Sequence, residues 1–173
     1  MREGDICIDA TAGNGRDTEV LCELVGGTGK VYAFDIQEIA LENTRKRLEE
    51  AGLLGRVRLI LAGHEKMADV VDEREQGEVS CVVFNFGYLP GGDYEIATKA
   101  ETSILAIKQA LNIVKKGGLV SLCIYSGGNT GFEEREGILG WLKSLDSKRY
   151  IVVVNEFYNR DNYPPLPVII LKR

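Results

Sequence analysis

Residues 8–18 of the chain read IDATAGNGRDT, in which Gly13 and Gly15 separate an apolar run from a polar segment. The run DICIDA at residues 5–10 is typical of a short buried strand, and residues 17–25 carry apolar side chains at helical spacing. A glycine turn between a strand and a helix lets a ligand approach the backbone and meet the free N–H groups of the helix. The stretch therefore predicts a ligand site, with a merely tight turn as the alternative.

The rest of the chain repeats the order of strand and helix. Strands are predicted at residues 30–36, 57–62, 79–86 and 119–125, and helices at residues 37–51, 67–71, 100–114 and 133–145. This alternation predicts an α/β, Rossmann-like fold, a mainly parallel sheet with helices on both faces. Two final strands, 149–158 and 167–173, are joined by a segment too short for a crossover helix, so they should pair antiparallel. We interpret residues 1–173 as one domain.

Composition sets limits on the class of protein. Hydrophobic residues make up 45% and charged residues 27% of the 173, as in a globular domain, and no apolar run is long enough to predict a membrane helix. The four cysteines are scattered, which predicts neither a disulfide framework nor a metal site and suits a cytoplasmic location. A net charge of −5 argues against a generally basic nucleic-acid binder, although a local basic patch stays compatible with it.

Two nucleotide-type ligands suit the glycine turn, a dinucleotide such as NAD and S-adenosylmethionine. The dinucleotide fingerprint requires a glycine at position 18, where the chain has Thr18. Asp9, at the end of the first strand, would repel a pyrophosphate but suits the positively charged amino-acid part of S-adenosylmethionine. The turn therefore favours S-adenosylmethionine, and an NAD-dependent oxidoreductase remains an alternative.

Further cofactor contacts are predicted at the ends of the next two strands. Asp35 lies twenty residues beyond Gly15, where an acid hydrogen-bonds a ribose diol, and Gln37 is placed to assist at the adenosine end. His64 is the single histidine of the chain and follows the third strand. Three interpretations of His64 stay open: contact with the adenine, an ordinary loop residue, and a general base.

The fourth strand ends in FNFGYLPGGD, residues 84–93, which places an amide, Asn85, three residues before an aromatic ring, Tyr88. An asparagine carbonyl can hold the N–H groups of a target amine, and a tyrosine can stack on the base that carries it. This pattern predicts the place of a reaction on an amine, with an inward-packed loop as the alternative.

Two groups of residues are candidates for binding a polynucleotide. Tyr158, Asn159, Arg160 and Tyr163 lie between the last two strands, a mixture suited to an unstacked nucleotide, although a loop fixed by prolines is the simpler interpretation. Basic side chains in or beside loops at the carboxyl ends of the strands are Lys66, Lys99, Arg135 and Arg160.

The motifs DATAGNGRDT, FDIQ, GHE and NFGYLPGGD, in this order, resemble the small class I methyltransferases described as rRNA methylases, some of which methylate the wobble uridine of tRNA. The resemblance covers nearly the whole chain and implies a seven-stranded sheet whose last strand is antiparallel. It implies S-adenosylmethionine as the donor and tRNA 5-aminomethyl-uridine, often 2-thiolated, as the acceptor, giving the 5-methylaminomethyl form. The residues that it places at the cofactor are Asn14, Gly15, Asp17, Asp35, Gln37, Gly63 and His64.

The same resemblance places Asn85 and Tyr88 at the methyl-transfer site. A primary alkyl amine is mostly protonated at neutral pH, so the site must favour its neutral form, and Asp93 or Tyr88 is placed to accept the proton. The expected partner is the anticodon arm of tRNA, and a homodimer would offer more surface to hold it. The alternatives are an rRNA or a small-molecule amine as the acceptor.

Overall fold

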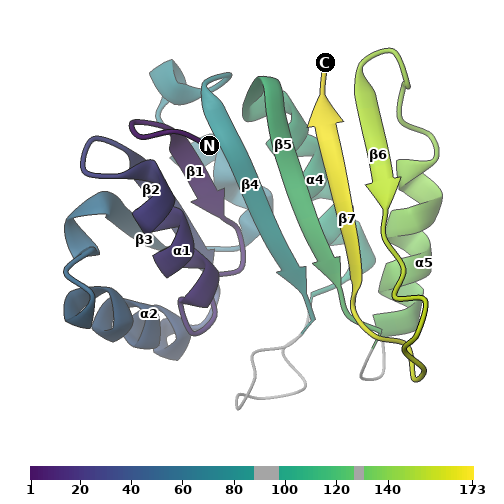
Figure 1. Ribbon diagram of the computed structural model, residues 1–173, viewed down its shortest axis with the longest axis horizontal. Helices are drawn as coiled ribbons and strands as arrows, with labels where there is room; N and C mark the ends of the chain where they lie inside the picture. Colours follow the sequence, from purple (N-terminus) through teal and green to yellow (C-terminus); the bar gives the residue numbers. More distant parts are fainter. Residues whose placement is uncertain (88–97, 127–130) are drawn as a thin grey trace.

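A computed structural model describes residues 1–87, 98–126 and 131–173. Its strands form one seven-stranded sheet in the order β3-β2-β1-β4-β5-β7-β6 (Figure 1). They are β1 (Ile6–Asp9), β2 (Lys30–Asp35), β3 (Val57–Leu61), β4 (Val79–Phe86), β5 (Val114–Ile124), β6 (Tyr150–Val154) and β7 (Leu166–Lys172). Neighbouring strands are parallel except β7, which runs antiparallel to both β5 and β6. The predicted sheet, with its antiparallel last strand, is confirmed.

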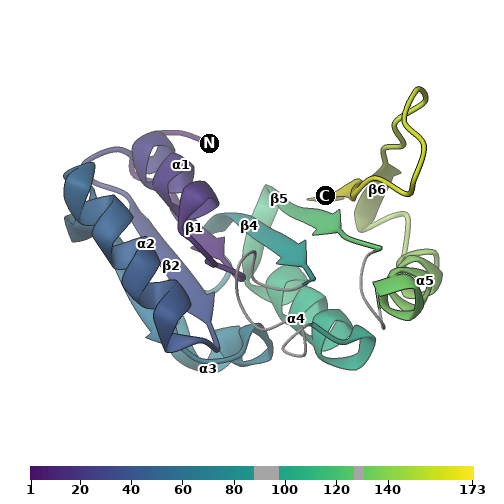
Figure 2. The same ribbon diagram turned by 90° about the horizontal axis from the view of Figure 1, so that it is seen from below.

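Helices cover the two faces of the sheet unequally. The α-helices are α1 (Arg16–Val25), α2 (Glu38–Glu50), α3 (Met67–Val70), α4 (Ala100–Ile113) and α5 (Gly131–Leu142). Short 3-10 helices are η1 (Leu54–Arg56), η2 (His64–Lys66) and η3 (Glu73–Glu75). Viewed along the sheet, α1 and α2 lie on one side and α3, α4 and α5 on the other (Figure 2). Within the described ranges, no helix is both long and apolar enough to cross a membrane.

Two apolar cores stabilise these layers. The larger joins the sheet to α3, α4 and α5, with Phe84 and Phe86 of β4 at its centre, and the smaller joins β1 and β2 to α1. β4 is buried along almost its whole length, as its continuous apolar sequence predicts for a central parallel strand. The carboxyl end of β4 is therefore held rigidly at the middle of the sheet.

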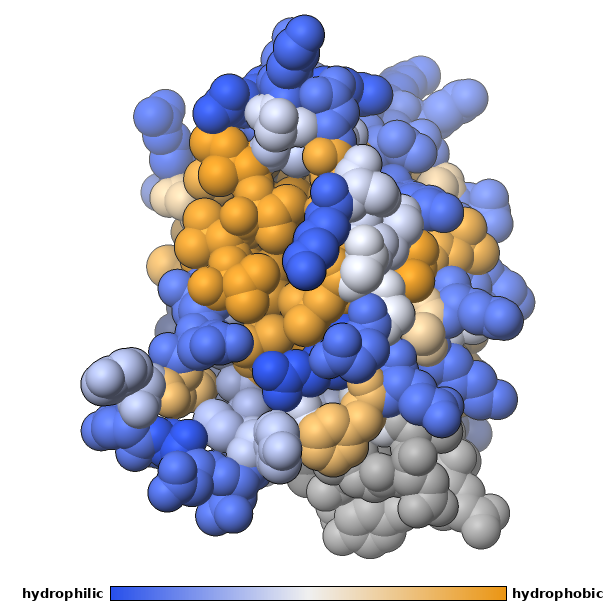
Figure 3. Space-filling model, turned by 90° about the vertical axis from the view of Figure 1, so that its right-hand side faces the viewer, coloured by the Kyte–Doolittle hydropathy of each residue, from blue (hydrophilic) through white to orange (hydrophobic). Residues whose placement is uncertain are grey.

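One face of β5, β7 and β6 carries no helix in the part of the chain that the structure describes (Figure 2). Apolar side chains gather on the side of the molecule where β6 forms the edge of the sheet (Figure 3). Val153 of β6 and Ile169 of β7, which pair across the two strands, are both exposed.

Two boundaries differ from the sequence prediction. β5 begins at Val114 and includes the segment Lys115–Gly118, which lay outside the predicted strand at residues 119–125. The segment fits because the β4–β5 register shifts between Val79 and Cys81, and because Gly117 adopts a φ of 78°. β6 ends at Val154, so residues 155–165 form a loop between β6 and β7.

The last strand also caps the carboxyl end of α4. The Lys172 ammonium donates to the carbonyl oxygens of Leu111 at 2.8 Å, Asn112 at 3.2 Å and Val114 at 2.7 Å. These carbonyls lie in or just after the last turn of α4, where helix acceptors have no partner inside the helix. A cation from β7 therefore caps a helix that lies behind the sheet.

Candidate functional site

The glycine turn after β1 is held between β4 and α2. Ala10 donates its N–H to the Val83 carbonyl at 2.9 Å, and the Thr44 hydroxyl of α2 donates to the Gly13 carbonyl at 3.0 Å. Gly15 precedes α1 with a φ of 76°, and a Cβ built on it would lie 2.9 Å from the Cα of Thr44. Packing against α2 alone thus requires glycine at position 15, and contact of Gly13 and Gly15 with a cofactor stays a prediction.

Asp9 is completely buried at the end of β1. Its carboxylate accepts the Thr18 hydroxyl at 2.6 Å and the Thr11 N–H at 3.1 Å. Burial raises the pKa of Asp9 to about 7, and the nearby carboxylates of Asp17 and Asp35 add to the shift. Asp9 and Thr18 therefore stabilise the turn from inside, and their direct contact with a cofactor stays a prediction.

Asp35 joins the turn to the start of α2. One carboxylate oxygen accepts the Gly13 N–H and the other accepts the Gln37 N–H, each at 2.9 Å. A carboxylate has about four acceptor positions, so Asp35 retains capacity for the two hydroxyl groups of a ribose. The structure thus brings Gly13, Asp35 and Gln37 together, while their contact with a cofactor stays a prediction.

Asn14 is fixed by side chains of α2. Asn43 donates to the Asn14 side-chain oxygen at 3.0 Å, and the Arg47 Nε donates to the Asn14 carbonyl at 2.9 Å. Arg47 also forms an ion pair of 2.7 Å with Glu19 of α1. These bonds lock the turn, α1 and α2 into one unit.

Asn85, at the end of β4, is held by two residues of the glycine-turn region. Its backbone N–H donates to the Thr11 hydroxyl at 2.7 Å, and its Nδ2 donates to the Asp17 carboxylate at 2.8 Å. An ionised carboxylate can only accept hydrogen bonds, so the amide nitrogen must face Asp17. The carbonyl oxygen, Oδ1, is then turned away from Asp17 as an acceptor. Asp17 thus orients the one amide that the sequence singled out for holding an amine.

Tyr125, just beyond β5, was not singled out from the sequence. Its ring packs against Gly87, where an added Cβ would lie 3.4 Å from the Cβ of Tyr125. The register pairs Asn85 with Cys123, two residues before Tyr125, and Cys123 and Tyr125 share a side-chain hydrogen bond. Burial raises the pKa of Tyr125. An aromatic residue at the carboxyl end of a central strand was the available signal, but its neighbourhood depends on the β4–β5 register.

His64 lies in the core beside the fourth strand. Its ring makes edge contacts with Phe84 and Phe86, with centroids 5.9 and 6.0 Å apart. Burial lowers the pKa of His64, and its Nε2 has no hydrogen-bond partner among the described residues. Gly63 precedes it, and a Cβ added at Gly63 would meet the Glu65 carboxylate. His64 thus packs as part of the core. Contact of Gly63 and His64 with the adenine stays a prediction.

A buried acid ties the amino ends of α4 and α5 together. Glu134 of α5 accepts the Ser103 hydroxyl of α4 at 2.6 Å and the Thr98 hydroxyl at 2.8 Å. Burial raises the pKa of Glu134. Its neighbour Arg135 donates to the Ser126 hydroxyl at 3.1 Å. Glu134 was not predicted, because a charged residue in an acidic helix turn looks solvated in the sequence.

Two predicted residues of the methyl-transfer site, Tyr88 and Asp93, lie outside the described residues. The arrangement around Asn85 therefore comes from Thr11, Asp17, Cys123 and Tyr125.

Comparison with known structures places this geometry in the class I methyltransferase fold. A Thermotoga maritima SAM-dependent O-methyltransferase, 20% identical, shares the fold with a TM-score of 0.66 over 99% of this chain and 60% of that one. A family model described as "Putative rRNA methylase" matches residues 31–171. The chain belongs to this rRNA methylase family.

Three relatives show how similar the chain is to proteins of this family. A crystal structure titled "putative rRNA-methylase" from Clostridium thermocellum is 46% identical, with a TM-score of 0.95 over all of this chain and 91% of that one. A Streptococcus mutans "putative methyltransferase" in complex with SAH is 36% identical, with a TM-score of 0.89 over all of this chain and 91% of that one. An Arabidopsis thaliana "tRNA (mnm(5)s(2)U34)-methyltransferase, chloroplastic" is 39% identical over 181 residues, and this chain spans 65% of its length.

The contact between Gly15 and Thr44 predicts a strong response to a single methyl group. Gly15→Ala adds a clash with α2 to a left-handed φ, so we expect a loss of roughly 2–4 kcal/mol in the free energy of unfolding. Gly77→Ala is the matched control, because Gly77 has a φ of 87° but nothing within 4 Å of an added Cβ. Urea denaturation measures both, and equal losses would contradict the packing argument.

The buried Asp9 carboxyl predicts a pH-dependent stability. Its pKa is raised from 3.8 to about 7 in the folded chain, so the folded state holds this proton more tightly than the unfolded state. The wild type should therefore lose up to about 1.4 kcal/mol per pH unit as the pH rises through this interval. Asp9→Asn carries no such charge, so its stability relative to the wild type should improve between pH 5 and pH 7. Parallel urea-denaturation profiles over this range would refute the assignment.

Proposed function

We propose that the chain is an S-adenosylmethionine-dependent N-methyltransferase acting on a primary amine. The observation that carries the proposal is the Asn85 amide, which Asp17 holds by its nitrogen at 2.8 Å beside the glycine turn. This arrangement offers the Asn85 carbonyl oxygen to an N–H donor at the carboxyl ends of the central strands. In open α/β sheets, ligands bind at the carboxyl ends of the strands, where the strand order reverses, and β1 and β4 meet there.

The residues present fit the cofactor. Asp35 has acceptor capacity for the ribose hydroxyl groups, and the turn and the first turn of α1 supply backbone N–H groups. The carboxylates of Asp17 and Asp35 both interact with that of Asp9, which suits a cationic ligand and opposes a pyrophosphate. The solved Streptococcus mutans relative holds SAH, the demethylated form of the same cofactor. When bound, S-adenosylmethionine supplies an electrophilic methyl group.

The chain's own contribution is to position the amine and to keep it neutral. A carbonyl acceptor at Asn85 holds an N–H group and so directs the nitrogen lone pair away from itself. Asn85 is partly buried, and this partial desolvation opposes the ammonium form of the amine. Methylation forms an N–C bond, breaks the S–C bond and releases one proton from the amine. Tyr88 and Asp93 stay the proposed acceptors of that proton.

The proposed substrate is 5-aminomethyl-uridine, with or without a 2-thio group, at the wobble position of tRNA. The name of the Arabidopsis relative gives the methylated form of this nucleoside. The primary amine of 5-aminomethyl-uridine provides the N–H groups that the Asn85 carbonyl would accept. We further propose contact with the anticodon arm, a homodimer and a cytoplasmic location; the free cysteines, mostly buried, suit a reducing compartment.

The family description favours a second candidate, an rRNA acceptor. Incubating the protein with isotopically labelled donor and with purified tRNA or rRNA separates the two. Mass spectrometry of the digested nucleosides should find labelled 5-methylaminomethyl-uridine in tRNA alone. Label in rRNA alone would replace the proposed substrate, and thermal stabilisation by NAD but not by S-adenosylhomocysteine would favour the oxidoreductase alternative.

Asn85→Ala should lower turnover roughly 100-fold, because positioning a nucleophile contributes several orders of magnitude to a transfer reaction. Cofactor affinity should stay within a few-fold, since Asp35 and the turn are unchanged. A tRNA methylation assay beside isothermal titration with S-adenosylhomocysteine measures the two effects. Unchanged turnover would remove Asn85 from the site.

Asp17→Asn tests the orientation of the Asn85 amide. An asparagine at position 17 can donate as well as accept, so the Asn85 amide is free to turn over, and turnover should fall roughly 10-fold. Asp69→Asn is the matched control, since it makes the same charge change at an exposed position of α3. Equal activities of the two variants would contradict an orienting role for Asp17.

A further inference from the structure

Four exposed aromatic side chains and one arginine lie in the loop after β6 and in the first turn of α5. Phe157 is 46%, Tyr158 104%, Tyr163 67% and Phe132 48% exposed. We call these rings and Arg160 the aromatic loop cluster. Large apolar side chains normally avoid such exposure, so a group of four at one place marks a contact surface.

The cluster is organised by contacts of its own. Tyr163 and Phe132 pack edge to face with centroids 5.0 Å apart, which joins the loop to the first turn of α5. The Arg160 guanidinium lies over the Phe157 ring at 5.6 Å. Asn162 and Tyr163 both adopt a left-handed backbone, with φ values of 65° and 49°, and two prolines follow. A strained backbone of this kind persists only where its surroundings hold it, so the chain holds Tyr163 in place against Phe132.

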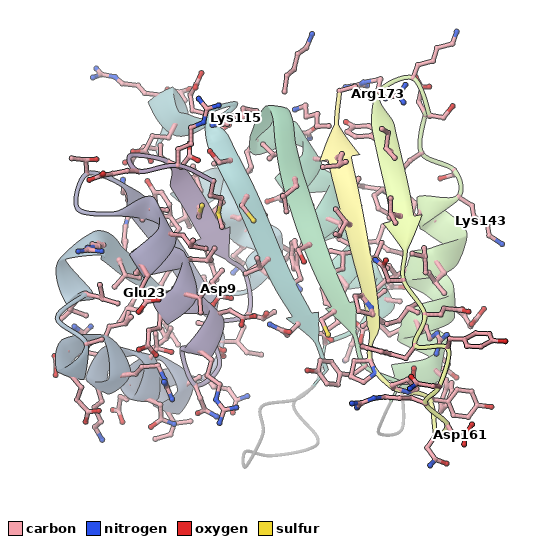
Figure 4. The ribbon with its side chains drawn as sticks, in the orientation of Figure 1. Asp9, Glu23, Lys115, Lys143, Asp161 and Arg173 are labelled. Carbon is pink, nitrogen blue, oxygen red and sulfur yellow. The ribbon has the colours of Figure 1, made fainter. Side chains whose placement is uncertain are left out.

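The cluster lies at the end of the sheet where the candidate site is. The loop between β6 and β7, marked by Asp161, lies at the same end as the tips of β4 and β5, while Lys115 and Arg173 mark the opposite end (Figure 4). β5 and β7 lie between β4 and β6 in the sheet. At about 4.8 Å per strand spacing, β6, which leads into the cluster, lies about 14 Å from β4, which carries Asn85. About four stacked nucleotides cover this span at roughly 3.4 Å each.

The charges of the loop indicate which part of a nucleic acid it contacts. Residues 155–165 contain Glu156, Arg160 and Asp161, which sum to a net charge of −1. Such a loop does not neutralise phosphates. Exposed rings with a guanidinium plane instead offer stacking partners for unpaired bases.

We propose that the aromatic loop cluster binds single-stranded RNA by stacking on bases within a few nucleotides of the base to be methylated. The proposal rests on the proposed function, which supplies an RNA substrate, and adds a second site to it. Tyr158 is the principal stacking residue, because its ring is fully exposed and its removal leaves the Tyr163–Phe132 contact intact.

The test is fluorescence anisotropy with a labelled single-stranded oligoribonucleotide of anticodon-loop sequence, using the whole chain without methyl donor. Tyr158→Ala should weaken binding roughly 5- to 100-fold, the effect of losing one stacked base. Tyr158→Phe keeps the ring and should bind within twofold of the wild type. Leu24→Ala, an exposed apolar side chain on α1, controls for general loss of apolar surface and should also leave binding unchanged.

Two further measurements separate stacking from other contacts. The slope of log affinity against log salt should be the same for Tyr158→Ala and the wild type, because no phosphate contact is lost. Binding of a duplex RNA should be unaffected by Tyr158→Ala, since paired bases do not offer their faces. An affinity of Tyr158→Ala within twofold of the wild type, or an equal loss for duplex and single strand, overturns the proposal.

Failure of this proposal is distinguishable from failure of the proposed function. In a tRNA methylation assay, Tyr158→Ala should raise KM about tenfold and leave kcat within twofold. A wild type that methylates tRNA, with a Tyr158→Ala variant of unchanged KM, refutes the cluster alone. A wild type that binds single-stranded RNA through Tyr158 but transfers no methyl group refutes the proposed function alone.

Discussion

The candidate site depends on the left-handed backbone conformation of Gly15. This conformation lets α1 begin directly after the glycine turn and lets α2 pack against the turn. With its φ of 76°, Gly15 brings the chain round so that Thr18 reaches back to Asp9 and Asp17 reaches Asn85. Thr44 occupies the space that any side chain at position 15 would need. Backbone conformation at one residue therefore sets the direction of an amide on another strand.

Within the described residues, the carboxylates of Asp9, Asp17 and Asp35 form no ion pair, which gives the site its acidic character. Asp9, Asp17 and Asp35 are bound mainly by N–H and hydroxyl donors, and their mutual repulsion adds to the raised pKa of Asp9. Hydrogen bonds of this kind orient the carboxylates, but at Asp9 burial outweighs them and raises the pKa to about 7. A cationic cofactor would lower the cost of keeping three acids together, which a pyrophosphate would raise.

Most of the fold was predictable, because strands and helices follow from hydrophobic spacing alone. The antiparallel last strand followed from a connection too short for a helix, and the structure confirms it. The segment Lys115–Gly118 was predicted wrongly, since only the neighbouring strand shows where the register shifts. Asp35 and Asn85 could be chosen as candidates from their residue types and positions. The hydrogen bond between Asp17 and Asn85 joins positions 68 residues apart, and nothing in the sequence indicates it. Tyr125 and Glu134 were not predicted for the same reason, because the residues that they contact lie on other elements.

The position of β7 inside the sheet has a consequence for synthesis on the ribosome. β6 pairs only with β7, and β7 alone connects it to β5. Until residues 166–172 leave the exit tunnel, the β5 edge has no neighbour and α4 lacks the Lys172 cap. An open parallel edge of this kind is a template for mispairing with other nascent chains. The incompletely synthesised chain is therefore expected to need protection by a chaperone until β7 pairs with β5.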